Sequence, residues 1–174
     1  SGEQLAAEVE QLAGLLERDP SPLGDVEGAR VLVVGAGGGL DTQALAKAGP
    51  GWRFTGVDPA ATMLDLARHV LGEETMRRVE LIKGGVEAAP EGPFDGATLI
   101  LVLGILPDDG SKLATLKDIR RRLKPGAPFV AAHGSFPQSS IAERDRWLDR
   151  YAAYAIASGA DPDVTQKGRE AVAA

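Results

Sequence analysis

The 174-residue sequence has no cysteine, only two histidines and few aromatic residues, which make up 5% of the chain. Without cysteine there is no disulfide, no thiolate nucleophile and no cysteine-ligated zinc, and we expect no metal site. No apolar stretch reaches the roughly 20 residues of a membrane-spanning helix, and no signal peptide is visible. These absences predict a cytoplasmic protein that does not associate with a membrane.

Positive charge is also in short supply. The chain has 25 acidic and 19 basic residues, a formal net charge of −6 and no long run of lysine and arginine. Nucleic acid is therefore an unlikely partner, because its phosphates attract basic surfaces. The length predicts one domain with a proper core, and 44% hydrophobic residues are ordinary for a globular protein.

The most informative stretch begins with an apolar run at residues 31–34, typical of a buried strand. Residues 35–39 follow with four glycines in five positions, which allow positive φ and close approach of a ligand. Residues 40–47 predict a helix, with Asp41 and Thr42 as capping candidates.

The same stretch ends with a second predicted strand at residues 53–57, and Asp58 follows it directly. The free N–H groups of a glycine loop and a helix N-terminus favour electron-rich groups of a ligand. An acid about 20 residues beyond the loop can accept both hydroxyls of a ribose. The order strand, glycine loop, helix, strand and acid therefore predicts a nucleotide-type binding unit.

The spacing of the glycines narrows the choice of nucleotide. A dinucleotide fingerprint would need a glycine at position 40, which is Leu40, and no Lys-Ser or Lys-Thr pair follows as a phosphate loop requires. The glycines at 35, 37 and 39 resemble motif I of the class I S-adenosylmethionine-dependent methyltransferases. The resemblance covers about residues 29–133, and four further features occur in the family's order: Asp58, Met63-Leu64, Phe94-Asp95 and Leu123-Lys124-Pro125-Gly126.

The resemblance implies an α/β Rossmann-like sandwich, with a mostly parallel sheet and helices on both faces. The pattern predicts further strands at residues 79–83, 96–103 and 127–132 and a helix at 112–122, with Lys124 as a solvated turn residue. The family's fold normally ends in an antiparallel hairpin, and no convincing strand pair follows residue 133. Either the chain is truncated, or terminal helices or a second subunit cover the last strand; the oligomeric state is left open.

S-adenosylmethionine is the cofactor that the resemblance implies, with S-adenosylhomocysteine as its product. Asp58 would bind the ribose, and Met63 would lie beside the adenine. The turn after the third strand has Gly85 where many relatives have an acid, so Glu87 is a candidate substitute. The cofactor-binding residues implied are Gly35, Ala36, Gly37, Gly39, Asp58, Pro59, Met63, Gly85, Val86, Glu87 and Leu101.

The implied reaction is an in-line methyl transfer to a small-molecule acceptor, in which alignment matters more than any side chain. His133, at the end of the fifth predicted strand, is the candidate general base. From residue 139 the chain turns helical, and Trp147 and Tyr151 are candidates for substrate contact. A second helix is expected within residues 164–174.

Three parts are expected: an amphipathic N-terminal helix and linker at 1–28, which is a packing helix or a lid, a cofactor-binding domain at 29–136 and a helical cap at 137–174. Val33, Gly85 and Gly104 depart from the family's usual acids and histidine. One alternative is therefore a catalytically inactive methyltransferase-like interaction domain. A second is an NAD-dependent oxidoreductase, which Leu40 disfavours.

Overall fold

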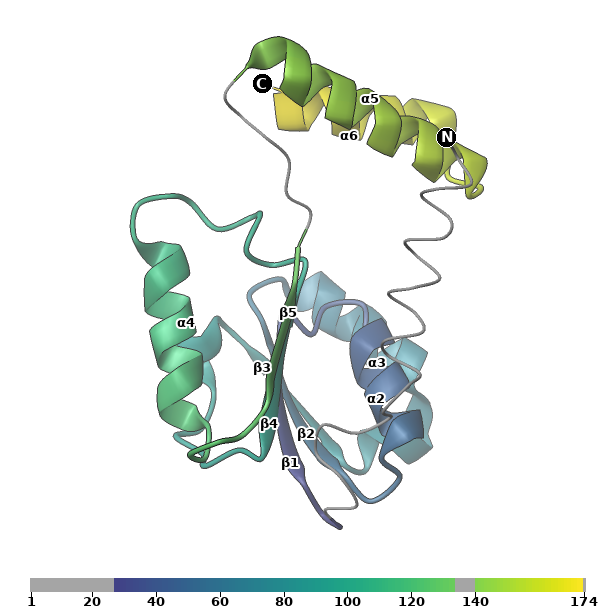
Figure 1. Ribbon diagram of the computed structural model, residues 1–174. Coiled ribbons are helices and arrows are strands. Elements are labelled where there is room, and N and C mark those ends of the chain that lie inside the picture. Colours follow the sequence, from purple (N-terminus) through teal and green to yellow (C-terminus); the bar gives the residue numbers. More distant parts are fainter. Residues whose placement is uncertain (1–26, 134–139, 174) are drawn as a thin grey trace. The chain divides into compact units, whose positions relative to one another are not determined.

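A computed structural model describes residues 27–133 and 140–173, which belong to two compact units considered separately below (Figure 1). The helix expected at residues 3–18 lies outside the described residues. In the first unit, five parallel strands form one sheet in the order β3-β2-β1-β4-β5. The strands are β1 (Arg30–Val34), β2 (Arg53–Asp58), β3 (Val79–Lys83), β4 (Gly96–Ile100) and β5 (Phe129–Ala132).

This order places the first strand in the middle of the sheet. From β1 the chain moves to β2 and β3 on one side, then crosses back to β4 and β5 on the other. The carboxyl ends of β1 and β4 are therefore the point where the direction of winding reverses, and ligands of open α/β sheets bind there. The topology confirms the Rossmann-like fold predicted from the sequence.

Helices cover both faces of the sheet (Figure 1). On one face lie α2 (Leu40–Ala48) and α3 (Ala61–Met76), and on the other lie α4 (Ser111–Arg122) and the short 3-10 helix η1 (Val86–Ala88). The α3 helix is broken at Gly72, whose φ is 68°.

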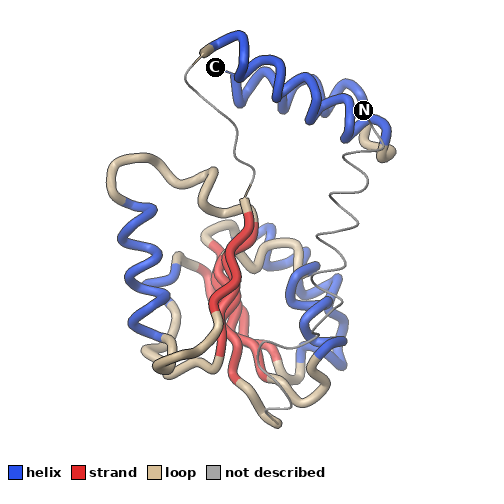
Figure 2. The backbone as a smooth tube through the Cα atoms, viewed as in Figure 1, coloured by secondary structure: helices blue, strands red, loops and turns tan. Residues whose placement is uncertain are grey.

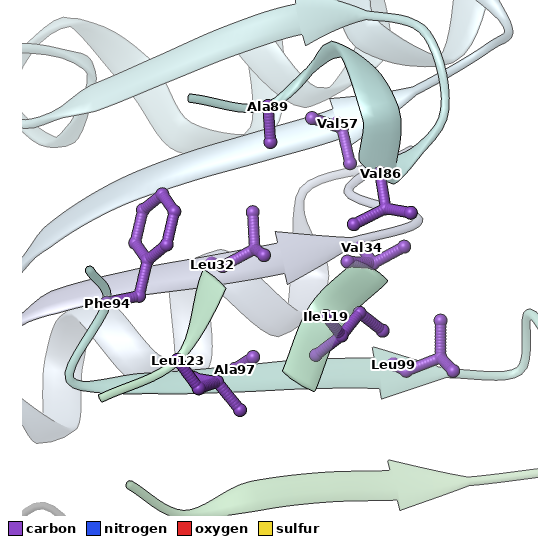
Figure 3. Packing of buried hydrophobic residues seen from close by; sticks show 10 residues of the cluster. All are labelled: Leu32, Val34, Val57, Val86, Ala89, Phe94, Ala97, Leu99, Ile119 and Leu123. Atoms are coloured by element: carbon purple, nitrogen blue, oxygen red, sulfur yellow. The ribbon is translucent and has the colours of Figure 1, made fainter. Parts of the chain in front are cut away.

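The alternating side chains of β1 divide the core into two layers. Leu32 and Val34 pack with Ile119 of α4 and Val86 of η1, as Figure 3 shows. Val31 and Val33 belong to the opposite layer, with residues of α2 and α3. Because neighbouring strand residues face opposite sides, a strand buried on both faces is apolar throughout, as the run at 31–34 predicts.

Two strands are shorter than predicted. β4 ends at Ile100 rather than at residue 103, because Leu101 turns into a left-handed conformation with a φ of 59°. β5 begins at Phe129 rather than at residue 127, because the Ala127 N–H donates to the Lys124 carbonyl and closes a turn. Apolar composition predicted both runs correctly but did not locate their ends.

The capping prediction for α2 is wrong. Its N-cap is Gly39, and neither Asp41 nor Thr42 caps the helix with its side chain. Thr42 instead lies in the first turn, and its hydroxyl is buried without a hydrogen-bond partner in the described part of the chain.

The second unit is a pair of helices, α5 (Ile141–Ala157) and α6 (Pro162–Ala173), which Figure 2 draws in blue. Ser140 caps α5 by accepting the Glu143 N–H at 3.4 Å. Arg169 of α6 binds Asp149 of α5 at 2.7 Å. Residues 140–173 contain no strand, and no helix in the described ranges is long and apolar enough to cross a membrane.

Candidate cofactor site

The glycine loop is tied to the end of the neighbouring strand. The N–H groups of Gly35 and Ala36 both donate to the carbonyl of Val57, at 2.9 and 3.0 Å. Gly35 has a φ of 81°, a conformation that favours glycine. These bonds hold the loop beside Asp58, the last residue of β2.

Asp58 is the centre of the candidate site. Its Oδ2 atom accepts the Gly37 N–H at 3.0 Å, and its Oδ1 atom accepts the Ala60 N–H at 2.8 Å. Each carboxylate oxygen has about two acceptor positions, so each keeps one after these bonds. A half-buried carboxylate in a fixed orientation, with one free position on each oxygen, suits a ligand with two adjacent hydroxyls.

Gly37 fits this arrangement because it has no side chain. A Cβ atom at this position would lie 2.6 Å from Oδ2 of Asp58 and 2.9 Å from Cβ of Met63. Any larger residue would have to displace the carboxylate or the helix behind it. The bare backbone at Gly37 therefore allows both the Asp58 hydrogen bond and the close approach of a ligand.

Met63 joins the loop to α3. Its carbonyl accepts the Gly38 N–H at 3.2 Å, and its side chain is 40% exposed on the α3 side of the loop. A thioether in this position is suited to contact with an aromatic ring. Pro59 is exposed in the short connection from Asp58 to α3.

The segment after β4 reaches the loop from the other side of the switch point. Val102 contacts Gly35 so closely that a Cβ there would clash with its Cγ2 atom. The Leu101 N–H donates to the Ala132 carbonyl at 2.7 Å, so Leu101 is also tied to the end of β5. His133 follows Ala132 directly and is exposed. Leu101 and the predicted base thus belong to the same edge of the sheet.

The turn after β3 supplies the third part of the site. Gly85 is extended and precedes η1, and its N–H donates to Glu87 Oε1 at 3.0 Å. The Glu87 carboxylate therefore closes its own turn. The side chain of Val86 is buried in the core.

The structure brings most of the predicted cofactor residues to one edge. The glycine loop forms hydrogen bonds with Asp58 and Met63, and it contacts Val102, the residue after Leu101. Gly84 donates to the Asp58 carbonyl at 3.0 Å and so attaches the turn at residues 85–87. Trp147 and Tyr151 belong to the other unit, where both are exposed and Arg150 lies 5.1 Å from the Trp147 ring.

Two charged groups near the sheet ends behave differently from each other. Asp41 lies in the first turn of α2, where burial raises the pKa of its carboxyl. Asp95 lies at the amino end of β4, where the Arg30 N–H and then the Lys124 ammonium lower the pKa of its carboxyl. Lys124 is 49% exposed beside its turn, as expected of a solvated turn residue, and it also binds Asp95 at 2.5 Å.

Sequence reasoning missed Arg122, which read as a basic residue at the end of a helix. Its side chain is 2% exposed. The guanidinium donates to the carbonyls of Glu87, Ala89 and Pro90 at 3.2–3.3 Å and so fixes η1 and the residues that follow it against α4. The carbonyls that accept these hydrogen bonds are distant in sequence, so the residues near Arg122 in the sequence could not have indicated its role.

The family of the chain follows from comparison with known proteins. Residues 31–126 match the family model described as a methyltransferase domain. The chain belongs to this family. The match includes the glycine loop, Asp58 and the Leu123–Gly126 turn. It confirms the resemblance to the class I S-adenosylmethionine-dependent methyltransferases.

Individual relatives agree with this family. The chain is 35% identical over 122 residues to a demethylmenaquinone methyltransferase of Lactococcus lactis, covering 68% of this chain and 47% of that protein. It is 36% identical over 105 residues to a ubiquinone biosynthesis O-methyltransferase of Xanthomonas oryzae, covering 59% of this chain and 41% of the relative. The chain thus spans about half, or less, of the length of these curated relatives.

A solved structure shows the same fold. The crystal structure of a putative methyltransferase from Bacillus halodurans aligns with a TM-score of 0.61 and 21% identity, covering 83% of this chain and 60% of that one.

Proposed function

We propose that this chain binds S-adenosylmethionine and transfers its methyl group to a small-molecule acceptor. The observation that carries the proposal is the Asp58 carboxylate, which accepts the N–H groups of Gly37 and Ala60 at the end of β2, next to the switch point of the sheet. The family match supports it. The names of the relatives, a demethylmenaquinone methyltransferase and a ubiquinone biosynthesis O-methyltransferase, support a small molecule as the acceptor here.

The residues around Asp58 fit the cofactor. The free acceptor positions of the carboxylate would take the two ribose hydroxyls. The side chain of Met63 is exposed beside the loop and would lie against the adenine. The N–H groups of residues 35–39 all donate within the protein, so the loop does not offer the free N–H groups expected from the sequence. The N–H groups of the first turn of α2 would face the carboxylate end of the cofactor, and the turn at residues 85–87 would border the base.

When bound, S-adenosylmethionine supplies a methyl group on a positively charged sulfur, which makes that sulfur a good leaving group. The protein must then align the acceptor and exclude water. Leu101 and Val102, at the end of β4, border the site with apolar side chains that suit this task. His133 would accept a proton if the acceptor must lose one.

In this proposal, different residue ranges bind the cofactor and the acceptor. Residues 29–136 form the cofactor-binding domain, and residues 137–174 form a helical cap in which Trp147 and Tyr151 contact the acceptor. We also propose that the protein acts in the cytoplasm.

Calorimetric titration with S-adenosylmethionine and S-adenosylhomocysteine tests the cofactor assignment. The wild-type protein should bind both saturably, and Asp58→Ala should bind neither measurably while remaining folded by circular dichroism. A folded wild-type protein that gives no heat and no thermal shift with either ligand would contradict the proposal and favour the inactive interaction domain. A preference for NAD would favour the oxidoreductase.

A further inference from the structure

Asp41 is a half-buried carboxylate that no group in the described part of the protein binds. It is the second residue of α2, and it does not cap the helix. Within residues 27–133 and 140–173 its side chain forms no hydrogen bond or ion pair, and burial alone raises the pKa of its carboxyl. Such a carboxylate loses hydration without compensation from another side chain, so a bound cation would stabilise it.

The place of Asp41 on α2 follows from its two neighbours along the helix. Thr42 is fully buried, and the Gln43 amide donates to the Val70 carbonyl of α3 at 3.0 Å. Successive helical residues are about 100° apart, so Asp41 lies on the flank of α2 opposite to the one that faces α3. Both helices cover the same face of the sheet (Figure 1), and α3 packs on β3 and β2. The flank with Asp41 is therefore turned toward β4.

Asp41 and Asp58 thus lie on opposite sides of the glycine loop. Asp58 ends β2, which is separated from β4 by one strand. Neighbouring strands are about 4.8 Å apart, so β2 and β4 are about 10 Å apart. In S-adenosylmethionine the sulfur and a short methylene chain separate the ribose from the amino-acid end. A cofactor whose ribose binds Asp58 can therefore extend across the loop and present its amino-acid end to Asp41.

Other acids at this edge of the sheet are already in use. The Glu87 carboxylate closes its own turn. In the loop before α4, Asp109 accepts the N–H and the hydroxyl of Ser111, and the residue before Asp109 pairs with a lysine of α4. Among these carboxylates in the described ranges, only that of Asp41 has no partner in the protein.

The first turn of α2 is also suited to the second charge of an amino acid. The Gln43 N–H donates to the Gly39 carbonyl at 2.8 Å, whereas the N–H groups of residues 40–42 come before the first hydrogen bond of the helix and have no acceptor within it. Such N–H groups bind carboxylates. An amino acid carries its carboxylate and its ammonium on one carbon atom, so one turn of helix offers a group for each.

We propose that Asp41 binds the α-ammonium group at the amino-acid end of S-adenosylmethionine. Asp58 holds the ribose and Asp41 holds the opposite end, and two anchored ends restrict the orientation of the sulfonium between them. This inference rests on the proposed function, and it adds to that site a residue that positions the cofactor.

Two ligands that differ only in the ammonium group test this assignment in calorimetric titrations. One is S-adenosylhomocysteine, and the other is its deaminated analogue, in which a hydrogen atom replaces the ammonium and the carboxylate is kept. Wild type should bind S-adenosylhomocysteine at least about tenfold more tightly than the analogue, because the analogue leaves Asp41 without a cation. Asp41→Asn should bind S-adenosylhomocysteine at least about fivefold less tightly than wild type, and the analogue at least as tightly.

Asp65→Asn is the matched control for the loss of one negative charge. Asp65 lies in α3, where its side chain is 74% exposed and pairs with Arg68. Because an exposed charge is screened by solvent, this variant should bind both ligands within about twofold of wild type.

Several outcomes would overturn this inference and leave the proposed function intact. These are a wild-type protein that binds both ligands equally, an Asp41→Asn variant that keeps the wild-type preference, and an Asp41→Asn variant that loses affinity for both ligands alike. Equal losses of S-adenosylhomocysteine affinity in Asp41→Asn and Asp65→Asn would also overturn it. A wild-type protein that binds neither ligand contradicts the proposed function itself, because both ligands carry the ribose assigned to Asp58.

Discussion

Two aspartates at opposite edges of the same sheet show how position decides the use of a carboxylate. Asp58, at the carboxyl end of β2, accepts hydrogen bonds from two backbone N–H groups, and in the described ranges it forms no ion pair. Asp95, at the amino end of β4, accepts the Arg30 N–H at 2.9 Å and binds Lys124. The first keeps acceptor capacity for a ligand, whereas the second joins parts of the fold.

The rest of each edge follows the same division. Glycines and exposed apolar residues surround Asp58, whereas arginines that bind main-chain carbonyls lie toward the other edge. Arg122 binds the segment after η1, and Arg78 donates to the carbonyls of Ala46, Gly49 and Trp52 at 2.7–3.1 Å. We therefore expect changes at the amino edge to alter stability and changes at the carboxyl edge to alter binding.

The largest effect on stability is expected from Arg122→Met. It leaves buried carbonyls without donors, and we expect the free energy of unfolding to fall by about 3 kcal/mol. Urea denaturation measures this. Arg121→Met is the matched control: Arg121 also pairs with Asp118, but its side chain is 59% exposed, so the loss should stay below about 0.5 kcal/mol. Equal losses in both variants would contradict the structural role of Arg122.

Gly37→Ala should produce the largest effect on binding among conservative changes. The new Cβ would lie 2.6 Å from Asp58 Oδ2, so the loop or the carboxylate must move. We expect affinity for S-adenosylhomocysteine to fall by about 2 kcal/mol, or roughly thirtyfold, in calorimetric titration.

Gly104→Ala is the control for Gly37→Ala. It lies after β4, and a Cβ at Gly104 meets nothing within 4 Å. Its affinity should match that of wild type. If Gly37→Ala binds as tightly as Gly104→Ala, the close approach at Gly37 does not matter for binding.

Arg78→Met should have a smaller effect on stability, about 1 kcal/mol, because it removes donors from the last carbonyls of α2. Thermal unfolding followed by circular dichroism measures it. Arg77→Met changes the exposed neighbour and should leave the transition almost unchanged. A lower affinity for S-adenosylhomocysteine in Arg78→Met, at a temperature where the variant is folded, would contradict the expectation that changes at the amino edge alter only stability.

The smallest effect is expected at Asp95. The Arg30 N–H and Lys124 lower the pKa of its carboxyl from the usual 3.8. Its contribution is therefore complete above that value and is lost as the pH falls through the lower pKa of the folded state. Asp95→Asn should reduce stability at pH 7 by less than about 1 kcal/mol, and the difference from wild type should shrink below about pH 4. A difference that grows in acid would contradict this assignment.

The sequence predicted most of the sheet because short apolar runs mark most of its strands. The runs at 31–34, 53–57 and 79–83 are strands within a residue at either end, and the glycine loop and Asp58 lie together as their spacing indicates. These features depend on side chains that neighbour one another in sequence, or on the regular crossover of a parallel sheet.

The features that the sequence could not predict depend on the backbone conformation of single residues or on distant partners. β4 ends early because Leu101 takes a left-handed conformation, with a φ of 59°. Arg122 is buried because carbonyls more than 30 residues away accept its hydrogen bonds. Glu87 accepts the Gly85 N–H, a hydrogen bond within the turn that the residue types alone did not indicate.

The most direct test of the two-edge account compares Asp58→Asn with Asp95→Asn by calorimetric titration with S-adenosylhomocysteine and by thermal unfolding. The account predicts that Asp58→Asn loses saturable binding and unfolds near the wild-type temperature, whereas Asp95→Asn keeps the wild-type affinity. A folded Asp58→Asn protein that binds S-adenosylhomocysteine as tightly as wild type would contradict the account.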